Sequence, residues 1–368
     1  MMNQNLIDRI LKRKWTPELI KKYMGDIESC WLAYSLDEEI RQNAASGGTI
    51  TTLFTYLLEE GEIDGALVCT TEVEGNELVP RYKILTTREE LIAAQGSKYI
   101  ETNFAHDAVP LIKEFPGKLA LALIPCDTWI VNTLRKNNAD VDAKIKLAIS
   151  VFCGHISEPA LSRLVIKKYK PAGLSLISFR HRVGHWRGKT RFKFEDQSVM
   201  EKPFSAFSDY QNLYFFCARK CLHCNDHTGY LSDISVGDVW LQFMKKNPIK
   251  HNAVIVRNKK AESIMLAAHQ KEKICLQSVS EEFIADAQAR SLPMHYNVSA
   301  RVKAGKLLGI NISDPVHERV RLVDFLIAYI ILLNYRWTTT IRGRLEVERI
   351  PKILIKLYLY ALKALEVL

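Results

Sequence analysis

The chain has 368 residues, a formal net charge of +10 and eight cysteines. That length gives ample material to bury the core of one large domain or two ordinary ones. The N-terminus, MMNQNLIDRILKRKW, lacks the apolar core of a signal peptide, which predicts a cytoplasmic protein. In that compartment, cysteines are metal ligands or buried thiols rather than disulfides.

The positive charge is concentrated toward the C-terminus. From Arg301 to the end, twelve Lys or Arg stand against six acids, a surplus that exceeds half of the net charge. Such a field attracts an acidic protein, an anionic membrane or nucleic acid. No helix-turn-helix, zinc-finger spacing or aromatic-basic RNA motif accompanies the charge, so nucleic acid is excluded as the expected partner.

Residues 1–42 are predicted to form a helical N-terminal segment. A turn, Ser46-Gly47-Gly48-Thr49, then opens a predicted helix whose apolar residues recur at helical spacing up to Gly61. Small residues before a helix leave backbone N–H groups open to a phosphate. A simple N-cap explains the same residues equally well.

An apolar strand at 66–70 and a turn at Glu74-Gly75-Asn76 predict a hairpin that returns through Leu85. Thr86 or Thr87 with an acid three residues later then predicts a capping box. Lys98 follows in a loop, QGSKY, where it either contacts a cofactor or is simply solvated.

Two unbroken apolar runs, 119–124 and 147–152, are typical of strands buried on both faces. The first ends at Pro125-Cys126 and the second at Cys153-Gly154, and the two cysteines are 27 residues apart, about the length of one strand-helix-strand unit. If the strands are parallel, both thiols lie at the carboxyl edge of the sheet, where open α/β sheets place their sites. At least one of them is therefore expected to be a ligand or to line a site.

Three more cysteines, Cys217, Cys221 and Cys224, follow in the spacing C-x3-C-x2-C among charged and polar residues. Closely spaced loop thiols are typical of a soft-metal or iron-sulfur site, and an iron-sulfur cluster is favoured over zinc. The alternative is that they are ordinary small buried residues. A preceding segment, 179–187, is dense in cations and aromatic residues, which fits either anion binding or a solvated hairpin.

The last 70 residues differ in character. The apolar run 325–333 is too short to span a membrane. Pro351 begins a predicted amphipathic helix rich in Leu, Ile, Tyr and Lys, which either packs on the protein itself or contacts a membrane surface or partner through 320–368.

The motifs occur in a specific order: AASGGTITTLFTYLLEEGEIDGALV, QGSKY, Pro125-Cys126, Cys153-Gly154, CLHCND and SDISVGDVW. In that order they resemble the β-subunit family of coenzyme F420 hydrogenases and dehydrogenases over roughly residues 43–240. Proteins of that family bind FAD and a 4Fe-4S cluster and pass electrons between a low-potential carrier and a substrate. Some relatives are encoded among polysaccharide biosynthesis enzymes.

The resemblance implies roles for particular residues. It places Ser46, Gly47, Gly48 and Thr49 at the flavin phosphates and Lys98 near the flavin. It assigns one 4Fe-4S cluster to Cys126, Cys153, Cys221 and Cys224, with Cys217 as an alternate ligand. His155 and His185 are weak candidates for a catalytic acid or base because they are polar residues beside glycines.

The expected fold is α/β: a mixed sheet body with helices on its faces, divided into segments 1–42, 43–298 (flavin and iron-sulfur) and 299–368 (basic and helical). Many relatives carry a ferredoxin-like segment of closely spaced cysteines, whereas residues 1–42 hold only Cys30. Pro125-Cys126 also lacks the flanking Gly-Thr and Gln of many relatives, which leaves the substrate open. The resemblance thus implies an external donor, either an acidic protein such as ferredoxin or the deazaflavin coenzyme, and a small-molecule substrate.

Two other functions fit parts of the sequence. One is a non-enzymatic partner protein of a membrane-associated biosynthetic complex, stabilised by zinc or a cluster. The other is a radical S-adenosylmethionine enzyme, because C-x3-C-x2-C also binds a cluster with an open iron, although that motif normally follows an early strand.

Overall fold

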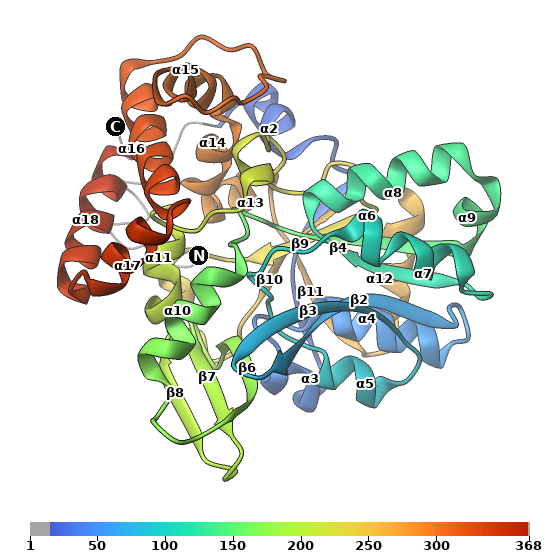
Figure 1. Ribbon diagram of the computed structural model, residues 1–368. Coiled ribbons are helices and arrows are strands. Elements are labelled where there is room, and N and C mark those ends of the chain that lie inside the picture. Colours follow the sequence, from blue (N-terminus) through green and yellow to red (C-terminus); the bar gives the residue numbers. More distant parts are fainter. Residues whose placement is uncertain (1–14, 367–368) are drawn as a thin grey trace.

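The computed structural model describes residues 15–366, and an eight-stranded mixed sheet forms its centre (Figure 1). The strand order is β11-β1-β10-β9-β5-β4-β2-β3, and a separate three-stranded sheet has the order β6-β7-β8. The strands are β1 (Ser29–Ser35), β2 (Gly65–Glu74), β3 (Glu77–Leu85), β4 (Leu119–Leu123), β5 (Ile145–Val151), β6 (Leu176–Val183), β7 (Lys189–Phe194), β8 (Val199–Pro203), β9 (Ile234–Asp238), β10 (Asn252–Val256) and β11 (Ile274–Ser278).

The middle of the large sheet is parallel. β4 pairs in parallel with both β2 and β5, and β5 pairs in parallel with β9. The apolar runs predicted as buried strands are β4 and β5, so that prediction is confirmed, as are the β2–β3 hairpin and the capping box formed by Thr87 and Glu90. The carboxyl ends of four neighbouring strands therefore meet at one edge of the sheet.

The N-terminal segment departs from its prediction. Residues 17–24 are helical, but residues 29–35 form β1, which lies inside the large sheet between β10 and β11. Cys30 and Leu32 pack on one face of the sheet while Trp31 and Ala33 pack on the other. This alternation has the period of a strand, and interpreting these residues as a helix was wrong. Residues 1–14 lie outside the described part of the chain.

Helices cover both faces of the large sheet. α4 and α12 pack against one face, and α6, α7 and α8 pack against the other, which gives a three-layer body. The helices are α2 (Pro17–Met24), α3 (Glu38–Asn43), α4 (Thr49–Glu59), α5 (Arg88–Ala93), α6 (Phe104–Asp107), α7 (Val109–Glu114), α8 (Pro125–Asn137), α9 (Ala139–Lys144), α10 (Pro159–Tyr169), α11 (Ser205–Gln211), α12 (Lys259–Gln270), α13 (Glu281–Ala287), α14 (Ser291–Tyr296), α15 (Val298–Leu308), α16 (Leu322–Thr338), α17 (Ile341–Arg349) and α18 (Lys352–Leu365).

A second hydrophobic cluster lies outside the large sheet. It joins the small sheet, α10 and α11 to the C-terminal helices α15–α18, which run from orange to red in Figure 1. Phe179, Phe207 and Phe215 from the middle of the chain pack there with Ile331 and Leu332 of α16. Within residues 15–366, no helix combines the length and apolar character needed to cross a membrane.

Candidate functional site: adjoining cavities at the carboxyl edge of the sheet

A cavity of about 300 Å³, here called the strand-end cavity, lies at the carboxyl ends of the parallel strands. Open α/β sheets bind their ligands at this edge because the loops that follow the strands surround it. The turn before α4, the QGSKY loop, the residues that follow β4 and β5, and the end of β9 all contribute to its lining. The lining includes Ser46, Gly48, Thr49, Gln95, Lys98, Tyr99, Ile124, Asp127, Cys153, His155 and Asp238. The sequence motifs therefore converge here.

The turn before α4 depends on its two glycines. Gly48 is the N-cap of α4 and has a left-handed backbone with φ 84°, which favours glycine. A Cβ on Gly47 would lie 2.6 Å from Ala33 O, so this residue must also be small. Gly47 is not in the cavity lining, so of the four residues predicted at the phosphates, Ser46, Gly48 and Thr49 line the cavity and Gly47 supports the turn.

Two buried polar atoms in the cavity lining lack a partner. The Thr49 side chain is 0 % exposed, and neither its Oγ1 nor Gln95 Oε1 has a hydrogen bond. Native proteins rarely leave buried polar atoms unpaired. Gly48 supplies no side-chain cap for α4, and Asn252 Oδ1 accepts only from Thr49 N–H, at 3.3 Å, which leaves the next N–H groups of the first turn available. These groups fit a ligand with hydrogen-bonding oxygens, such as the phosphates and ring carbonyls of a flavin nucleotide.

Lys98 supplies a cation at the other side of the cavity. Its Nζ donates to Ala94 O. Burial, together with the nearby Arg180 charge, lowers the pKa of Lys98 to about 8, although the Cys69 thiol opposes that shift. A bound anion would raise the pKa of Lys98 again and keep its ammonium group protonated.

Four of the predicted cysteines line one small cavity of about 20 Å³, here called the cysteine cavity. Cys126 is in the first turn of α8, Cys153 follows β5, and Cys221 and Cys224 belong to the loop after α11. Cys217 does not line this cavity; it is buried in the second hydrophobic cluster, and its thiol donates a hydrogen bond to Cys221. Cys217 therefore lies outside the cavity that the other four line, although its thiol contacts Cys221.

The chemistry of these thiols depends on their burial. Burial raises the pKa of Cys126 and Cys153 and raises that of Cys224 to about 12. The hydrogen bond from Cys217 lowers the pKa of Cys221. Thiolates packed this closely need a compensating positive charge, which a coordinated metal centre supplies. The donor set thus fits an iron-sulfur cluster.

A single metal ion fits less well. Across residues 15–366, no three His, Cys, Asp or Glu side chains lie close enough to hold one ion. Structural zinc needs four ligands about 2.0–2.3 Å from one point. A cluster holds its thiolates farther apart because irons and sulfides lie between them.

Arg301 stabilises the cysteine loop and was missed as a functional residue. Its side chain is 2 % exposed and donates to Leu222 O, Cys224 O and two carbonyls of α14, at 2.7 to 3.1 Å. In the sequence it was counted only as part of the C-terminal charge. A basic residue with no signature motif gave no signal that it would be buried.

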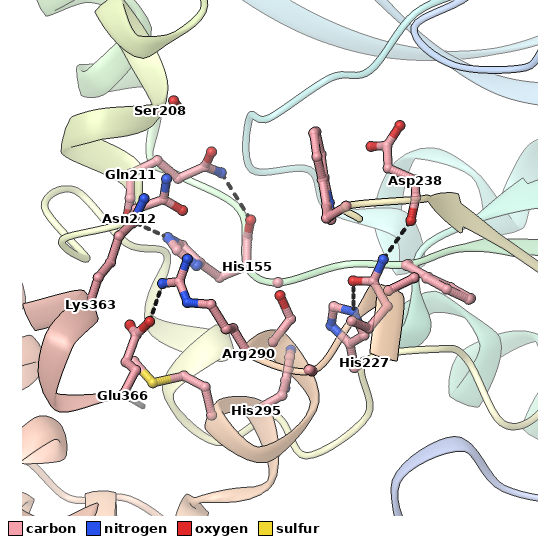
Figure 2. A pocket seen from close by; sticks show the side chains of 18 of the residues that line it. His155, Ser208, Gln211, Asn212, His227, Asp238, Arg290, His295, Lys363 and Glu366 are labelled. Carbon is pink, nitrogen blue, oxygen red and sulfur yellow. Dashed lines mark hydrogen bonds and ion pairs between the residues drawn. The ribbon is translucent and has the colours of Figure 1, made fainter. Parts of the chain in front are cut away.

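His155 is placed where three cavities meet. It lines the strand-end cavity, the cysteine cavity and a third cavity of about 330 Å³, here called the outer cavity and drawn in Figure 2. Its Nε2 donates to Gln211 O at 2.9 Å, its ring stacks on Tyr214, and burial lowers its pKa to about 4. His185 is exposed and lines none of these three cavities.

The strand-end and cysteine cavities adjoin. Ile124, Cys153, His155 and Ile156 line both of them. Backbone bridges from Ile100 to Ser157 and from Ser157 to Cys217 join the QGSKY segment, the loop after β5 and the cysteine loop. Groups bound in the two cavities would therefore be neighbours, which is the arrangement that electron transfer requires.

Comparisons with known proteins agree with the arrangement of the motifs. The family model "Coenzyme F420 hydrogenase/dehydrogenase, beta subunit N-term" matches residues 30–106, and the model of the corresponding C terminus matches residues 117–282. A coenzyme F420 hydrogenase subunit beta from Methanosarcina barkeri is 27 % identical over 222 residues, which cover 59 % of this chain and 72 % of that protein. Its counterpart from Methanothermobacter thermautotrophicus is 28 % identical over 254 residues, covering 67 % and 82 %.

A solved structure has the same fold. A chain of the F420-reducing [NiFe] hydrogenase complex from Methanosarcina barkeri superposes with a TM-score of 0.62 at 21 % identity, covering 82 % of this chain and 99 % of that one. Together, the two family models cover well over half of the sequence, and their order along the chain is that of the motifs. The chain belongs to the coenzyme F420 hydrogenase/dehydrogenase beta subunit family.

Proposed function

We propose that the protein is an iron-sulfur flavoprotein oxidoreductase. It takes electrons from an external low-potential donor, an acidic ferredoxin-like protein or a deazaflavin coenzyme, and delivers them to a small-molecule substrate. The observation that carries this proposal is that Cys153 and His155 line both the strand-end cavity and the cysteine cavity. When bound, a cluster supplies one-electron transfer and a flavin supplies two-electron chemistry.

The strand-end cavity is proposed to hold FAD. Thr49 Oγ1 and the first-turn N–H groups of α4 would bind a phosphate, with Ser46 and Gly48 beside it. Lys98 would contribute a positive charge near the flavin. The glycine turn allows the backbone to approach such a ligand closely.

The cysteine cavity is proposed to hold one 4Fe-4S cluster on Cys126, Cys153, Cys221 and Cys224, with Cys217 as an alternate ligand. Ile156 N–H points to Cys221 Sγ at 3.5 Å. Hydrogen bonds of this kind to ligand sulfurs tune the reduction potential of a cluster. Tyr214, stacked on His155, helps to exclude water from this side.

His155 is our candidate for a polar side chain close to the reacting atoms. Because its Nε2 donates to Gln211 O, the neutral ring leaves Nδ1 as a hydrogen-bond acceptor. His185, which pairs with Lys245 O on the surface, is the weaker of the two predicted candidates.

Anaerobic purification of the full chain tests the proposal. We expect bound FAD, about four irons per chain and an iron-sulfur absorbance. Colourless protein containing zinc would instead support the partner-protein function. Iron without flavin, with cleavage of S-adenosylmethionine, would support the radical enzyme. The position of Cys217 outside the cysteine cavity favours the flavoprotein over the radical enzyme.

We also propose that α17 and α18 contact an anionic membrane at its cytoplasmic face. Ile341, Ile353 and Leu357 are 80 %, 62 % and 58 % exposed. On α18, exposed apolar and aromatic side chains lie at 353, 354, 357, 358 and 360, while lysines at 352 and 356 follow one flank. An apolar face flanked by lysines is typical of a helix that lies in a membrane interface. A substrate in polysaccharide biosynthesis would suit such a location.

A further inference from the structure

The outer cavity opens onto the strand-end cavity. Tyr99, Phe152, Gly154, His155 and Asp238 line both of them. A molecule in the outer cavity would therefore touch a group bound in the strand-end cavity. Its volume of about 330 Å³ is near the lower end of the range for ligand pockets, about 300–1,000 Å³. It therefore suits a molecule of the size of a sugar or a small acid.

One wall of the outer cavity carries three neighbouring cationic side chains. Arg187 comes from the turn between β6 and β7, Arg290 precedes α14, and Lys363 is in the last turn of α18. Figure 2 shows Lys363 and Glu366 on the wall opposite Asp238. Arg290 is paired with Glu366, whereas Arg187 and Lys363 form no ion pair with any residue of the described chain.

These cations lie close enough to affect one another. Burial and then the charges of Arg290 and Arg187 lower the pKa of Lys363 to about 8, against the opposing attraction of Glu366 and Asp209. Holding like charges together costs free energy, and a bound anion would offset that cost. The surrounding charges thus favour an anionic ligand.

Three acids also line the cavity: Asp238, Glu366, which is paired with Arg290, and Asp286, which accepts a hydrogen bond from Trp15 Nε1 at 2.7 Å. Asp238 is paired with Arg182, and burial lowers the pKa of His227 to about 4, so that histidine is neutral. The side chains of Ser208 and Asn212 lie beside the cationic wall and make no hydrogen bond to other described residues. These groups are suited to bind hydroxyl groups.

We propose that the outer cavity is the substrate site and takes a small hydroxylated molecule that carries a phosphate or carboxylate. Lys363 and Arg187 hold the oxyanion, and Ser208 and Asn212 bind its hydroxyl groups. The orientation of the molecule toward the strand-end cavity rests on the proposed function, but anion binding itself does not. Arg290 and Lys363 lie beyond residue 282, where the family match ends. The C-terminal helices thus define the substrate class of this chain.

The test is calorimetric titration of the anaerobically purified full chain with glucose 1-phosphate, gluconate and glucose. We expect at least one of the two anions to bind at least about tenfold more tightly than glucose. The anion that binds more tightly shows whether the site prefers a phosphate or a carboxylate. Lys363→Gln and Arg187→Gln should each weaken it about tenfold, the effect of losing one charged hydrogen bond. Lys356→Gln is the matched control on the same flank of α18, outside the cavity lining, and should bind normally.

A second readout is proton uptake. At about pH 8, the wild-type protein should take up protons when it binds the anion. Proton uptake is detected because the measured heat then changes with the ionisation enthalpy of the buffer. Lys363→Gln should show no such change. Equal binding of glucose and both anions, no binding of either anion, or unchanged affinity in both cavity variants would overturn the proposal.

Flavin and iron are measured on the same samples. Intact flavin and iron with no anion binding would contradict only the substrate site. Specific anion binding without flavin or iron would contradict the proposed function and leave the anion site standing.

Discussion

The buried Arg182 forms a bidentate ion pair with the partly exposed Asp238, with Nη1 to Oδ2 at 2.5 Å and Nη2 to Oδ1 at 2.6 Å. Arg182 Nη2 also donates to Ala45 O at 2.7 Å, in the turn that leads into α4. Burial opposes ionisation of Asp238, but the Arg182 guanidinium holds the pKa of that carboxyl below its usual value. One side chain therefore joins the small sheet, the end of β9 and the turn at the strand-end cavity.

Replacing Arg182 by Met should lower stability because it leaves the Asp238 carboxylate, which is 22 % exposed, without its main cationic partner. Breaking a fully buried ion pair from one side costs about 3–5 kcal/mol, and the partial exposure of Asp238 lowers the cost here. The loss would be measured as a fall in the thermal unfolding midpoint. Arg180→Met is the matched control, since Arg180 donates only to the carbonyls of Asn43 and Gln95. Equal stability of the two variants would contradict a special role for the pair.

Flavin affinity should depend on pH through Lys98. Without FAD, burial lowers the pKa of Lys98 from its usual 10.5 to about 8, so the ammonium is present below that pH and is lost as the pH rises through it. The negative charge of bound FAD favours the ammonium, so FAD binding should weaken by up to about tenfold per pH unit above pH 8. Equilibrium titration of the apoprotein with FAD, followed by fluorescence, measures this.

Lys98→Met should bind FAD more weakly at pH 7 and show little pH dependence above pH 8. Lys83→Met, on the neighbouring hairpin and outside the strand-end cavity lining, is the control that should retain the wild-type profile. A wild-type affinity that stays constant from about pH 7 to 9.5 would remove Lys98 from the flavin site.

The cysteines should separate into two groups by iron content. Cys126→Ala and Cys153→Ala each remove a proposed ligand and should lose most of the iron. Cys217→Ala should keep it, because Cys217 lies outside the cysteine cavity. Iron analysis and the visible absorbance of anaerobically purified variants give the answer. If Cys217→Ala lost its iron and Cys126→Ala kept it, Cys217 would be the cluster ligand in place of Cys126.

Arg301→Met should disturb the cysteine loop. Four backbone carbonyls would lose a charged donor, and such hydrogen bonds contribute about 1.5–3 kcal/mol each before relaxation. We expect destabilisation of about 3 kcal/mol or more, together with reduced iron content. Lys303→Met, an exposed cation on the same helix, should change neither quantity. Normal iron and stability in Arg301→Met would show that the loop holds its shape without this residue.

Membrane contact is tested by co-sedimentation with vesicles of phosphatidylglycerol and phosphatidylcholine. The double change Ile353→Glu and Leu357→Glu should abolish binding, since both side chains are exposed on α18. Val199→Glu alters an exposed apolar residue on β8 and should bind like the wild type. Binding should weaken with added salt because lysines contribute. Equal sedimentation of all three proteins would contradict the proposal.

Local patterns predicted much of the body of the protein. The apolar runs that became β4 and β5, the β2–β3 hairpin and the capping box at Thr87 all depend on contacts between residues close in sequence. The thiols at the carboxyl edge could be placed because parallel strands direct their ends to one side. The division into segments 1–42, 43–298 and 299–368 stays a prediction.

Prediction from sequence failed where a residue's role depends on distant partners. β1 was interpreted as helix because its aromatic residues suit either structure, and only pairing with β10 and β11 makes it a strand.

Local patterns were enough to identify the family, the buried strands β4 and β5 and the two cysteines that follow them, because motif order and apolar runs are properties of short stretches of the chain. That Cys217 lies outside the cysteine cavity, that Arg301 and Arg182 are buried, and that α18 forms a wall of the outer cavity became clear only from the folded structure. Those features depend on long-range packing and on the balance between the desolvation and the pairing of charges. Local sequence patterns do not predict either of them.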